Sequence, residues 1–273
     1  MAKLKIGVLV SLNQNVRDEI KKVHDLELAS CQLCTWDPEI RTDELAEETS
    51  RACSDFGVEI SGLWVGYPGP STWNFTEGPA TIGFVPPDQR EMRVAALLQG
   101  IGFGVKLGVK DIITHAGFIP ENPNDPLYAG TIEALRTIAA RAKEEGMHFL
   151  FETGQETPIT LLRAMTDIGT GNLGVNLDPA NLLMYGKANP VDALDIIGSY
   201  VRGVHAKDGE YPTEPTALGV EKAMGEGRVN FPVLVPKLKS MGYEGALTIE
   251  REIGGDQQIT DIKRAISILE PLL

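Results

Sequence analysis

Residues 148–181 read HFLFETGQETPITLLRAMTDIGTGNLGVNLDPAN and contain a complete strand–helix–strand unit. The runs 148–152 and 173–178 are short and apolar without regular alternation, which is typical of parallel strands covered on both faces. Residues 158–167 lie between them and have a helical pattern. This order of elements predicts a βαβ unit of a parallel sheet.

The same alternation extends in both directions and repeats about eight times along the 273 residues. Eight units in about 270 residues favour closure into a (β/α)8 TIM barrel of the α/β class, formed as a single domain by residues 1–273. A doubly wound open sheet stays as the alternative, because the first two units are weakly patterned. The predicted strands are 5–10, 25–29, 58–63, 111–115, 148–152, 173–178, 201–205 and 246–250. The predicted helices are 42–56, 90–107, 131–145, 158–167, 191–200, 231–241 and 258–269.

Two connections are longer than a barrel needs, at residues 67–89 and 205–229. Long structured loops that follow barrel strands commonly line or cover the ligand site, so we expect both loops at the mouth of the barrel.

The composition restricts the class of partner. Lys and Arg number 25 against 38 Asp and Glu, for a net charge of −13. A surface this acidic repels nucleic acid unless a local basic patch exists, and we find none. No apolar run reaches the roughly 20 residues of a membrane span, and the N-terminus lacks a cleavage site for a signal peptide. We therefore expect a cytoplasmic protein that binds a small molecule.

Polar residues end several of the predicted strands. They are His115 in ITHAG, Glu152 in FLFETG, Asp178 in GVNLDPAN, His205 in GVHAKD and Glu250 in LTIERE. The C-terminal ends of barrel strands converge on the active site. Several carboxylates at one mouth would repel each other unless a cation neutralised them, so this pattern predicts a metal site.

Three carboxylates and one imidazole form a mainly oxygen donor set. Such a set favours one divalent ion, Mn²⁺ or Mg²⁺, with Co²⁺ or Zn²⁺ as alternatives. Two glutamates beside a metal indicate proton transfer next to a carbonyl, in which one glutamate removes a proton and the other returns it. Glu152 and Glu250 are the candidates for these catalytic roles.

Three other motifs are interpreted as structural. Residues 169–174 match G-x-G-x-x-G but precede a strand, which is the wrong context for a dinucleotide site. Cys31-Gln-Leu-Cys34 has neither a second cysteine pair nor a nearby histidine, so we interpret it as two ordinary thiols. His24 and His148 are expected at the beginnings of strands, at the opposite end of the barrel from the chemistry.

At these strand ends the sequence resembles the xylose isomerase-like TIM-barrel superfamily, in its sugar phosphate isomerase/epimerase branch with the ketose 3-epimerases. The resemblance covers essentially the whole chain. It is carried by FETGQETP, NLDPAN, VHAKDG and GEGRVNFPVLVPKLKSMGYEGALTIERE. It implies that Glu152, Asp178, His205 and Glu250 hold one divalent metal and that the two glutamates exchange the proton.

The substrate pocket departs from the family pattern. Asn181 stands where the family often has a histidine that contacts substrate, and Tyr211 is at an offset where the epimerases have an arginine. His115, Asn181, Lys207 and Arg228 are the candidate substrate contacts. The metal set is intact, but the particular sugar stays open.

The function predicted from the sequence is a metal-dependent isomerase or epimerase. Its substrate would be a sugar, sugar phosphate or polyol-derived ketone, and the reaction would pass through an enediolate. The alternatives are a related lyase or dehydratase, and a non-catalytic sugar-binding barrel. The sequence disfavours an endonuclease IV-like phosphodiesterase, because such an enzyme normally needs several zinc ions and more histidines than the four present. Barrels of this type often associate, so a homo-oligomer is a further expectation that no sequence patch decides.

Overall fold

Eight parallel strands close into a barrel in the computed structural model, which describes residues 3–273. Around the barrel the strands follow the order β1-β10-β7-β6-β5-β4-β3-β2. The closed barrel confirms the (β/α)8 prediction and excludes the open sheet. The strands are β1 (Lys5–Ser11), β2 (Ser30–Thr35), β3 (Glu59–Val65), β4 (Asp111–Thr114), β5 (His148–Glu152), β6 (Leu173–Leu177), β7 (Val201–Ala206) and β10 (Ala246–Ile249).

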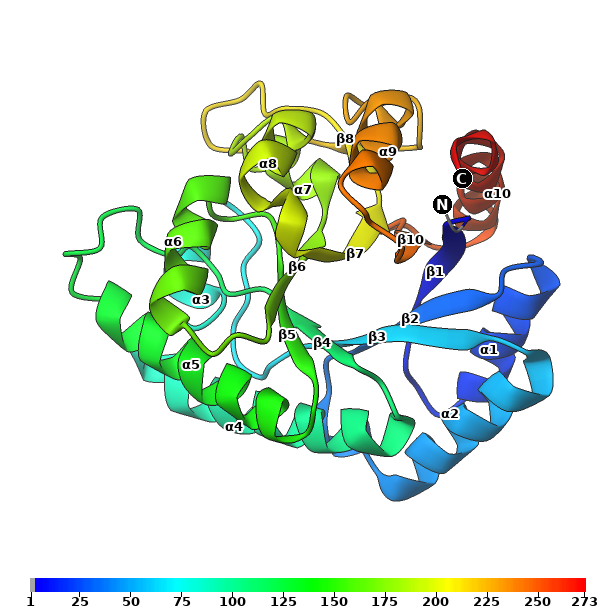
Figure 1. Ribbon diagram of the computed structural model, residues 1–273, viewed down its shortest axis with the longest axis horizontal. Helices are drawn as coiled ribbons and strands as arrows, with labels where there is room; N and C mark the ends of the chain where they lie inside the picture. Colours follow the sequence, from blue (N-terminus) through cyan, green and yellow to red (C-terminus); the bar gives the residue numbers. More distant parts are fainter. Residues whose placement is uncertain (1–2) are drawn as a thin grey trace.

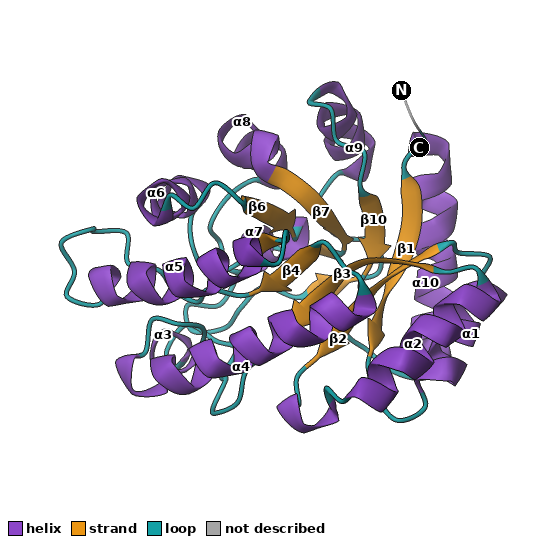
Figure 2. Ribbon diagram, turned by 60° about the horizontal axis from the view of Figure 1, so that its bottom comes forward, coloured by secondary structure: helices purple, strands orange, loops and turns teal. Residues whose placement is uncertain are grey.

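Helices surround the barrel as an outer layer (Figures 1 and 2). The layer consists of α1 (Val16–Asp25), α2 (Asp43–Phe56), α4 (Pro87–Leu107), α5 (Tyr128–Glu144), α6 (Pro158–Ile168), α8 (Pro190–Ile197), α9 (Phe231–Ser240) and α10 (Asp256–Leu269). Two short helices, α3 (Gly78–Thr81) and α7 (Pro179–Met184), lie in connections. Helix α2 shows how local sequence sets these bounds: the Thr42 hydroxyl accepts from Leu45 N at 3.2 Å, and Gly57 ends the helix at φ +66°.

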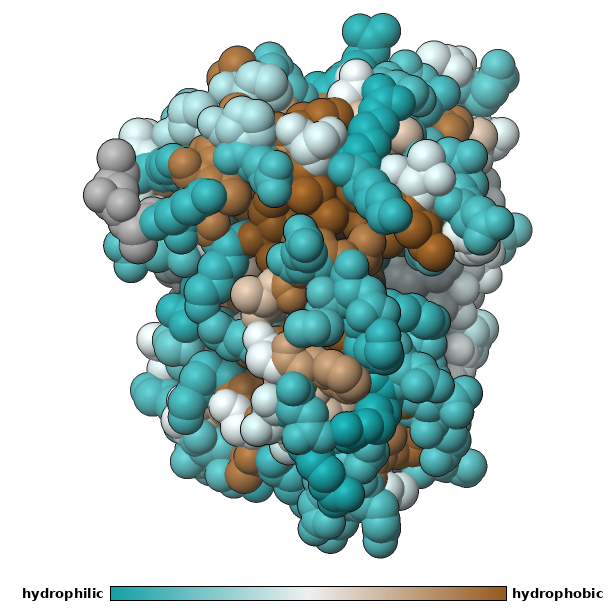
Figure 3. All heavy atoms as spheres, turned by 90° about the vertical axis from the view of Figure 1, so that its right-hand side faces the viewer, coloured by the Kyte–Doolittle hydropathy of each residue, from teal (hydrophilic) through white to brown (hydrophobic). Residues whose placement is uncertain are grey.

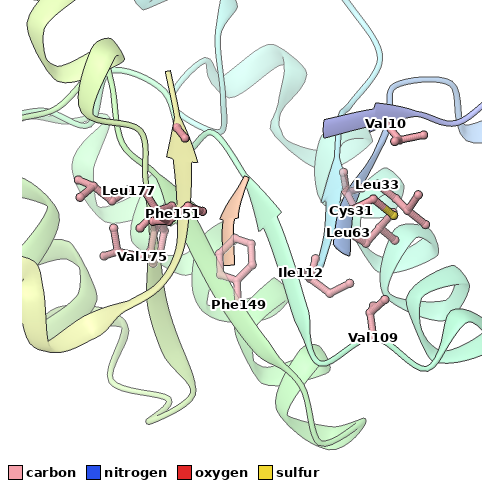
Figure 4. Packing of buried hydrophobic residues seen from close by; sticks show 14 of the residues in the cluster. Val10, Cys31, Leu33, Leu63, Val109, Ile112, Phe149, Phe151, Val175 and Leu177 are labelled. Carbon is pink, nitrogen blue, oxygen red and sulfur yellow. The ribbon is translucent and has the colours of Figure 1, made fainter. Parts of the chain in front are cut away.

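Each strand sends alternate side chains outward to the helices and inward to the barrel. On β5, Phe149 and Phe151 belong to the core between strands and helices, where Figure 4 shows them packed with neighbouring strand residues. Leu150 belongs instead to a separate cluster with Trp64 and Ile113. Glu152 follows Leu150 by two residues and therefore shares its inward face. The alternation of side chains along β5 therefore places the Glu152 carboxylate inside the barrel.

The prediction for the second strand was wrong. Residues 25–29 were expected to form it, but α1 ends at Asp25 and β2 begins at Ser30. All six residues of β2, SCQLCT, are buried, so even its polar side chains are shielded from solvent, and Gln32 faces the barrel interior. His24 consequently lies in α1, with Nδ1 3.0 Å from Phe56 O, and not at the start of a strand.

A cavity of about 840 Å³ lies on the outer side of β1 and β10, between α1 and α10. Its apolar lining includes Val8, Val23, Leu26, Ile259 and Ile262. Figure 3 shows this side of the molecule, where hydrophobic atoms gather in a band between polar side chains.

Among the described residues, no helix is both long and apolar enough to cross a membrane.

One buried charged side chain organises each of the two long loops. Arg93 on α4 is fully buried and donates to the carbonyl oxygens of Pro68, Pro70, Thr81 and Gly83, all in the loop 67–89. Asp208 accepts from the backbone N–H groups of Gly209, Gly225, Gly227 and Val229 in the second loop. That loop also contains the short hairpin of β8 (Asp208–Gly209) and β9 (Glu221–Lys222).

Replacing Arg93 by methionine should loosen the first loop and destabilise the fold. The change leaves four loop carbonyl groups without their donor, that of Gly83 in a buried position, and removes a guanidinium 4.6 Å from the Tyr67 ring. We expect a loss of about 2–4 kcal/mol in the free energy of unfolding, measured by urea denaturation, with faster proteolysis within residues 67–89. Arg51→Met is the matched control, because Arg51 is exposed and makes one surface ion pair at 3.3 Å. Equal stability of the two variants would contradict the role given to Arg93.

Candidate metal and sugar site

Four side chains predicted at strand ends meet inside the barrel mouth. Glu152, Asp178, His205 and Glu250 each offer one ligand atom, and these atoms lie within 4.8 Å of one another. Nδ1 of His205 is central, at 2.9 Å from Glu250 Oε2, 3.1 Å from Glu152 Oε1 and 3.8 Å from Asp178 Oδ2. His205 and Asp178 are fully buried, and Glu152 is 3% exposed.

A helix start fixes the Asp178 carboxylate. Asp178 is the N-cap of α7, and its Oδ1 accepts from Asn181 N at 2.8 Å. Thr153 Oγ1 bonds both the N–H and the carbonyl of Asp178, at 2.8 and 2.9 Å. The second oxygen, Oδ2, accepts no hydrogen bond from the described residues and faces the shared centre. The sequence NLDPAN therefore leaves one carboxylate oxygen free for a cation.

Gln32 sets the orientation of His205. Oε1 of Gln32 lies 2.6 Å from Nε2 of His205, so Nε2 carries a proton and donates it. That bond leaves Nδ1 to face the three carboxylates, as a metal-binding imidazole requires. Nε2 of Gln32 in turn donates to Asn176 Oδ1 at 3.3 Å.

Glu152 is held by donors from three directions. Trp64 Nε1 donates to Oε2, Asn181 Nδ2 lies 3.4 Å from Oε1, and His115 Nε2 lies 3.6 Å from the same oxygen. Burial alone would raise the pKa of Glu152, but His115 and His205 lower it below the usual value. Glu152 is therefore ionised at neutral pH.

Lys207 supplies the one fixed positive charge at the base of the site. Its buried ammonium lies 2.7 Å from Glu252 Oε1, 3.5 Å from Glu250 Oε2 and 3.6 Å from Asp178 Oδ2. Burial raises the pKa of Glu250, but Lys207 and His205 outweigh it, so this pKa falls well below the usual value. Burial raises the pKa of Asp178 to about 6.

The charges of this cluster match a divalent cation. When His205 is neutral, the three carboxylates carry three negative charges that Lys207, shared with Glu252, offsets only in part, so a divalent ion would meet a net negative site. The carboxylates of Glu250 and Glu152 raise the pKa of His205 well above normal in spite of burial. The same field that holds a proton at Nδ1 would hold a cation there. An oxygen-rich donor set with one imidazole suits Mn²⁺ or Mg²⁺.

The cluster forms the floor of a cavity of about 380 Å³. Trp36, Trp64, Trp73 and Tyr185 give it an aromatic wall, and Gln155 adds an amide. Gln155 is 1% exposed, and neither of its amide atoms has a hydrogen-bond partner among the described residues. As expected, both long loops contribute to this lining, through Trp73 from one and Leu218 from the other.

Three of the four predicted substrate contacts lie at this site, and one does not. His115 and Asn181 line the cavity, and Lys207 lies just beneath it. Arg228 is exposed and is not part of the lining, so we leave it out of the site. Sequence reasoning missed Gln32, Trp64 and Gln155. If β2 had been placed correctly, the alternation of its side chains would have predicted that Gln32 faces the barrel interior.

The motifs interpreted as structural also have clear positions. Cys31 and Cys34 lie on opposite faces of β2 as buried free thiols, Cys31 toward the helices and Cys34 inside the barrel. Residues 169–174 end α6 and lead into β6, with Gly169 and Gly171 at positive φ. His148 begins β5, at the end of the barrel opposite the cluster.

Comparison with known proteins identifies the family. A family described as xylose isomerase-like TIM barrel matches residues 20–272. The chain belongs to this family, whose fold is that of sugar isomerases and epimerases.

Individual relatives agree with this assignment. The structure of a xylose isomerase domain protein from Planctomyces limnophilus is 32% identical, with a TM-score of 0.93 over 99% of this chain and 98% of that one. D-psicose 3-epimerase, solved in the presence of D-fructose, has a TM-score of 0.73 at 16% identity over 99% of both chains, a likeness of fold alone. The uncharacterized protein MJ1311 of Methanocaldococcus jannaschii is 28% identical over 196 residues, which span 67% of this chain and 63% of that protein.

Removing the Gln32 carbonyl should weaken metal binding. Gln32→Leu takes away the acceptor that orients His205, and we expect Mn²⁺ affinity to fall about 10–100-fold in a calorimetric titration. Gln32→Glu keeps an acceptor oxygen and should bind Mn²⁺ more tightly than the leucine variant does. Thermal unfolding of both metal-free variants checks that the barrel is intact. Wild-type affinity in a folded Gln32→Leu protein would rule out the positioning role.

Glu156 should make the stability depend on pH. It is 3% exposed, and burial raises its pKa to about 8. The folded state therefore keeps a proton that the unfolded state loses above about pH 4.5. The contribution of protonated Glu156 to the free energy of unfolding is complete at low pH. It decreases between about pH 4.5 and 8, by at most about 1.4 kcal/mol per pH unit.

The matched variant is Glu156→Gln, which cannot ionise. Its unfolding free energy relative to wild type should increase from pH 5 to pH 8 in paired denaturant titrations. A constant difference across this range would show that Glu156 ionises normally.

Proposed function

We propose that this chain is a divalent-metal-dependent isomerase or epimerase of a sugar or related ketone, with Glu152 and Glu250 as the catalytic residues. The observation that carries the proposal is their placement. The two carboxylates approach Nδ1 of the same imidazole, and both line one cavity. Two ionised carboxylates around one small site can both reach a substrate bound between them.

Glu152, Asp178, His205 and Glu250 would hold the ion. A divalent ion bound there would polarise the carbonyl and hydroxyl oxygens of the substrate and stabilise negative charge on them. Mn²⁺ and Mg²⁺ fit the donor set best, with Co²⁺ and Zn²⁺ as alternatives.

The two glutamates divide the proton transfer. One carboxylate takes a proton from the carbon next to the carbonyl, which leaves an enediolate. The other carboxylate returns a proton, to the opposite face in an epimerase or to the neighbouring carbon in an isomerase. The low pKa values of Glu152 and Glu250 keep both groups ionised and able to accept a proton at neutral pH.

The remaining lining positions the substrate. His115 and Asn181, which line the cavity, would bond its oxygens near the reacting carbons. Lys207, the third predicted contact, lies beneath the floor against Glu250 and Asp178. Gln155 would use its unpaired amide for a further hydroxyl, since a buried amide gains most from a ligand that satisfies it.

Deuterium exchange tests the reaction directly. The protein, loaded in turn with Mn²⁺, Mg²⁺ and Co²⁺, is incubated in D2O with a panel of ketoses, and uptake at carbon is followed by NMR. We expect uptake beside the carbonyl with at least one ketose. Loss of water from the substrate would indicate a dehydratase instead, and metal binding without any exchange would indicate a binding protein.

Glu152→Gln and Glu250→Gln should each slow this exchange by about 10²–10⁴-fold, because an amide cannot accept the proton. Metal content is measured alongside, since each amide keeps one oxygen ligand. Glu59→Gln is the control, because Glu59 lies at the opposite end of the barrel, where it pairs with exposed Lys5. If both site variants retained metal and exchanged at the wild-type rate, the proton-transfer assignment would be wrong.

A further inference from the structure

All three tryptophans of the chain line the single cavity above the carboxylate cluster. Trp64 is 4% exposed and donates its N–H to Glu152, so it belongs to the floor. Trp36 packs on Trp64 with ring centroids 4.7 Å apart, and Trp73 meets Trp36 edge-on at 6.2 Å. The rings form a continuous aromatic surface from the reacting carboxylate to the cavity mouth.

The two outer rings remain open to solvent. Trp36 is 42% exposed and Trp73 is 39% exposed, although indole rings gain strongly from burial. Both are held in place rather than loose. Trp73 packs on His115 at 5.2 Å, and Trp36 lies so close to Gly66 that a methyl group there would come within 2.5 Å of Cε3. Two fixed, exposed aromatic faces at a cavity mouth are a surface for the apolar C–H face of a sugar ring.

The charge of the lining limits what else the ligand carries. Among the described residues that line this cavity, three are Glu and none is Lys or Arg. Lys207 lies beneath the floor and is already neutralised by Glu252, Glu250 and Asp178. The nearby Arg251 is paired with Glu221 and Asp261. A phosphate or carboxylate on the substrate would find no free cation here and would meet the exposed Glu252.

We propose that the substrate is an uncharged ketose linked to a second sugar ring, and that Trp36 and Trp73 bind this outer ring. The reacting ketose would lie between Glu152, Glu250 and Trp64, with Gln155 available to one of its hydroxyls. The inference rests on the proposed function and narrows it, because it selects a glycosylated, unphosphorylated substrate from the sugars and sugar phosphates that the fold accommodates.

Three ligands with a common ketose separate the alternatives. D-fructose, D-fructose 6-phosphate and isomaltulose (6-O-glucosyl-fructose) share the fructose skeleton and carry a free hydroxyl, a phosphate and a glucosyl group at C6, and the last two share the furanose form that a substituted O6 imposes. Calorimetric titration of the Mn²⁺-loaded protein should give isomaltulose an affinity about tenfold above that of fructose, the usual value of one good aromatic stacking contact. Fructose 6-phosphate should bind no better than fructose.

Variants of the outer rings test where the second ring binds. Trp36→Ala and Trp73→Ala should each reduce the isomaltulose-to-fructose affinity ratio toward one, whereas Trp36→Phe should keep most of it. Gly66→Ala, which displaces the Trp36 ring without removing it, should lower the ratio as well. Tyr200→Ala is the control, because this equally exposed aromatic residue lies outside the cavity lining.

The outcomes are distinct from those for the reaction itself. Tightest binding of fructose 6-phosphate would overturn the proposal, as would equal affinities for fructose and isomaltulose or failure of all three ligands to bind. Deuterium exchange into fructose without a disaccharide advantage would overturn this subsite and leave the proposed reaction standing. A disaccharide advantage that depends on Trp36 and Trp73, without exchange into any ketose, would support the subsite and overturn the reaction.

Discussion

The rest of this site depends on the repulsion among three carboxylates buried at one end of the barrel. Glu152, Asp178 and Glu250 converge on His205 where little water can screen them, so their charge must be balanced locally. Lys207 offsets part of this charge from a buried position, 3.5 Å from Glu250 and 3.6 Å from Asp178. The negative charge that remains would be balanced by a divalent ion. A cluster of this kind is costly to fold without a cation, so binding of a cation there would also stabilise the fold.

Hydrogen bonds from separate neighbours fix three of the four clustered side chains. Asp178 is held by the start of α7, His205 by Gln32, and Glu152 by Trp64. These partners come from different strands and turns, so no single element carries the geometry. A ligand fixed by its own neighbour loses little further freedom when an ion binds, and the site is preorganised in this sense. Arg93 fixes the loop that carries Trp73 in a similar way, through hydrogen bonds to its backbone carbonyl groups.

The sequence was sufficient to predict the barrel and the four titratable side chains that meet at its mouth, because both follow from local patterns. A carboxylate or imidazole that ends an apolar run is visible without knowledge of its partners. Strand β2 was misplaced because SCQLCT mixes polar and thiol side chains and lacks the apolar run of a typical buried strand, although all six residues are buried in the closed barrel. Contacts such as His205–Gln32 and Trp64–Glu152 join residues 173 and 88 positions apart. Local periodicity does not encode such pairings, so the residues that orient the ligands appear only in the folded chain.

The charge balance of the proposed reaction is compatible with an aromatic, uncharged wall above the carboxylate cluster. Under the proposed reaction, a proton that leaves the substrate carbon neutralises one glutamate while the substrate oxygens gain the negative charge. The total charge of the buried site is therefore the same before and after the transfer, and only its position changes. A substrate that enters uncharged therefore adds no net charge to the site at any stage. An anionic substrate would add negative charge beside Glu152, Glu250 and Glu252, and the cavity lining contains no Lys or Arg to offset it. Binding energy for an uncharged substrate must come from uncharged contacts, and Trp36, Trp64 and Trp73 offer aromatic surface for them in the lining.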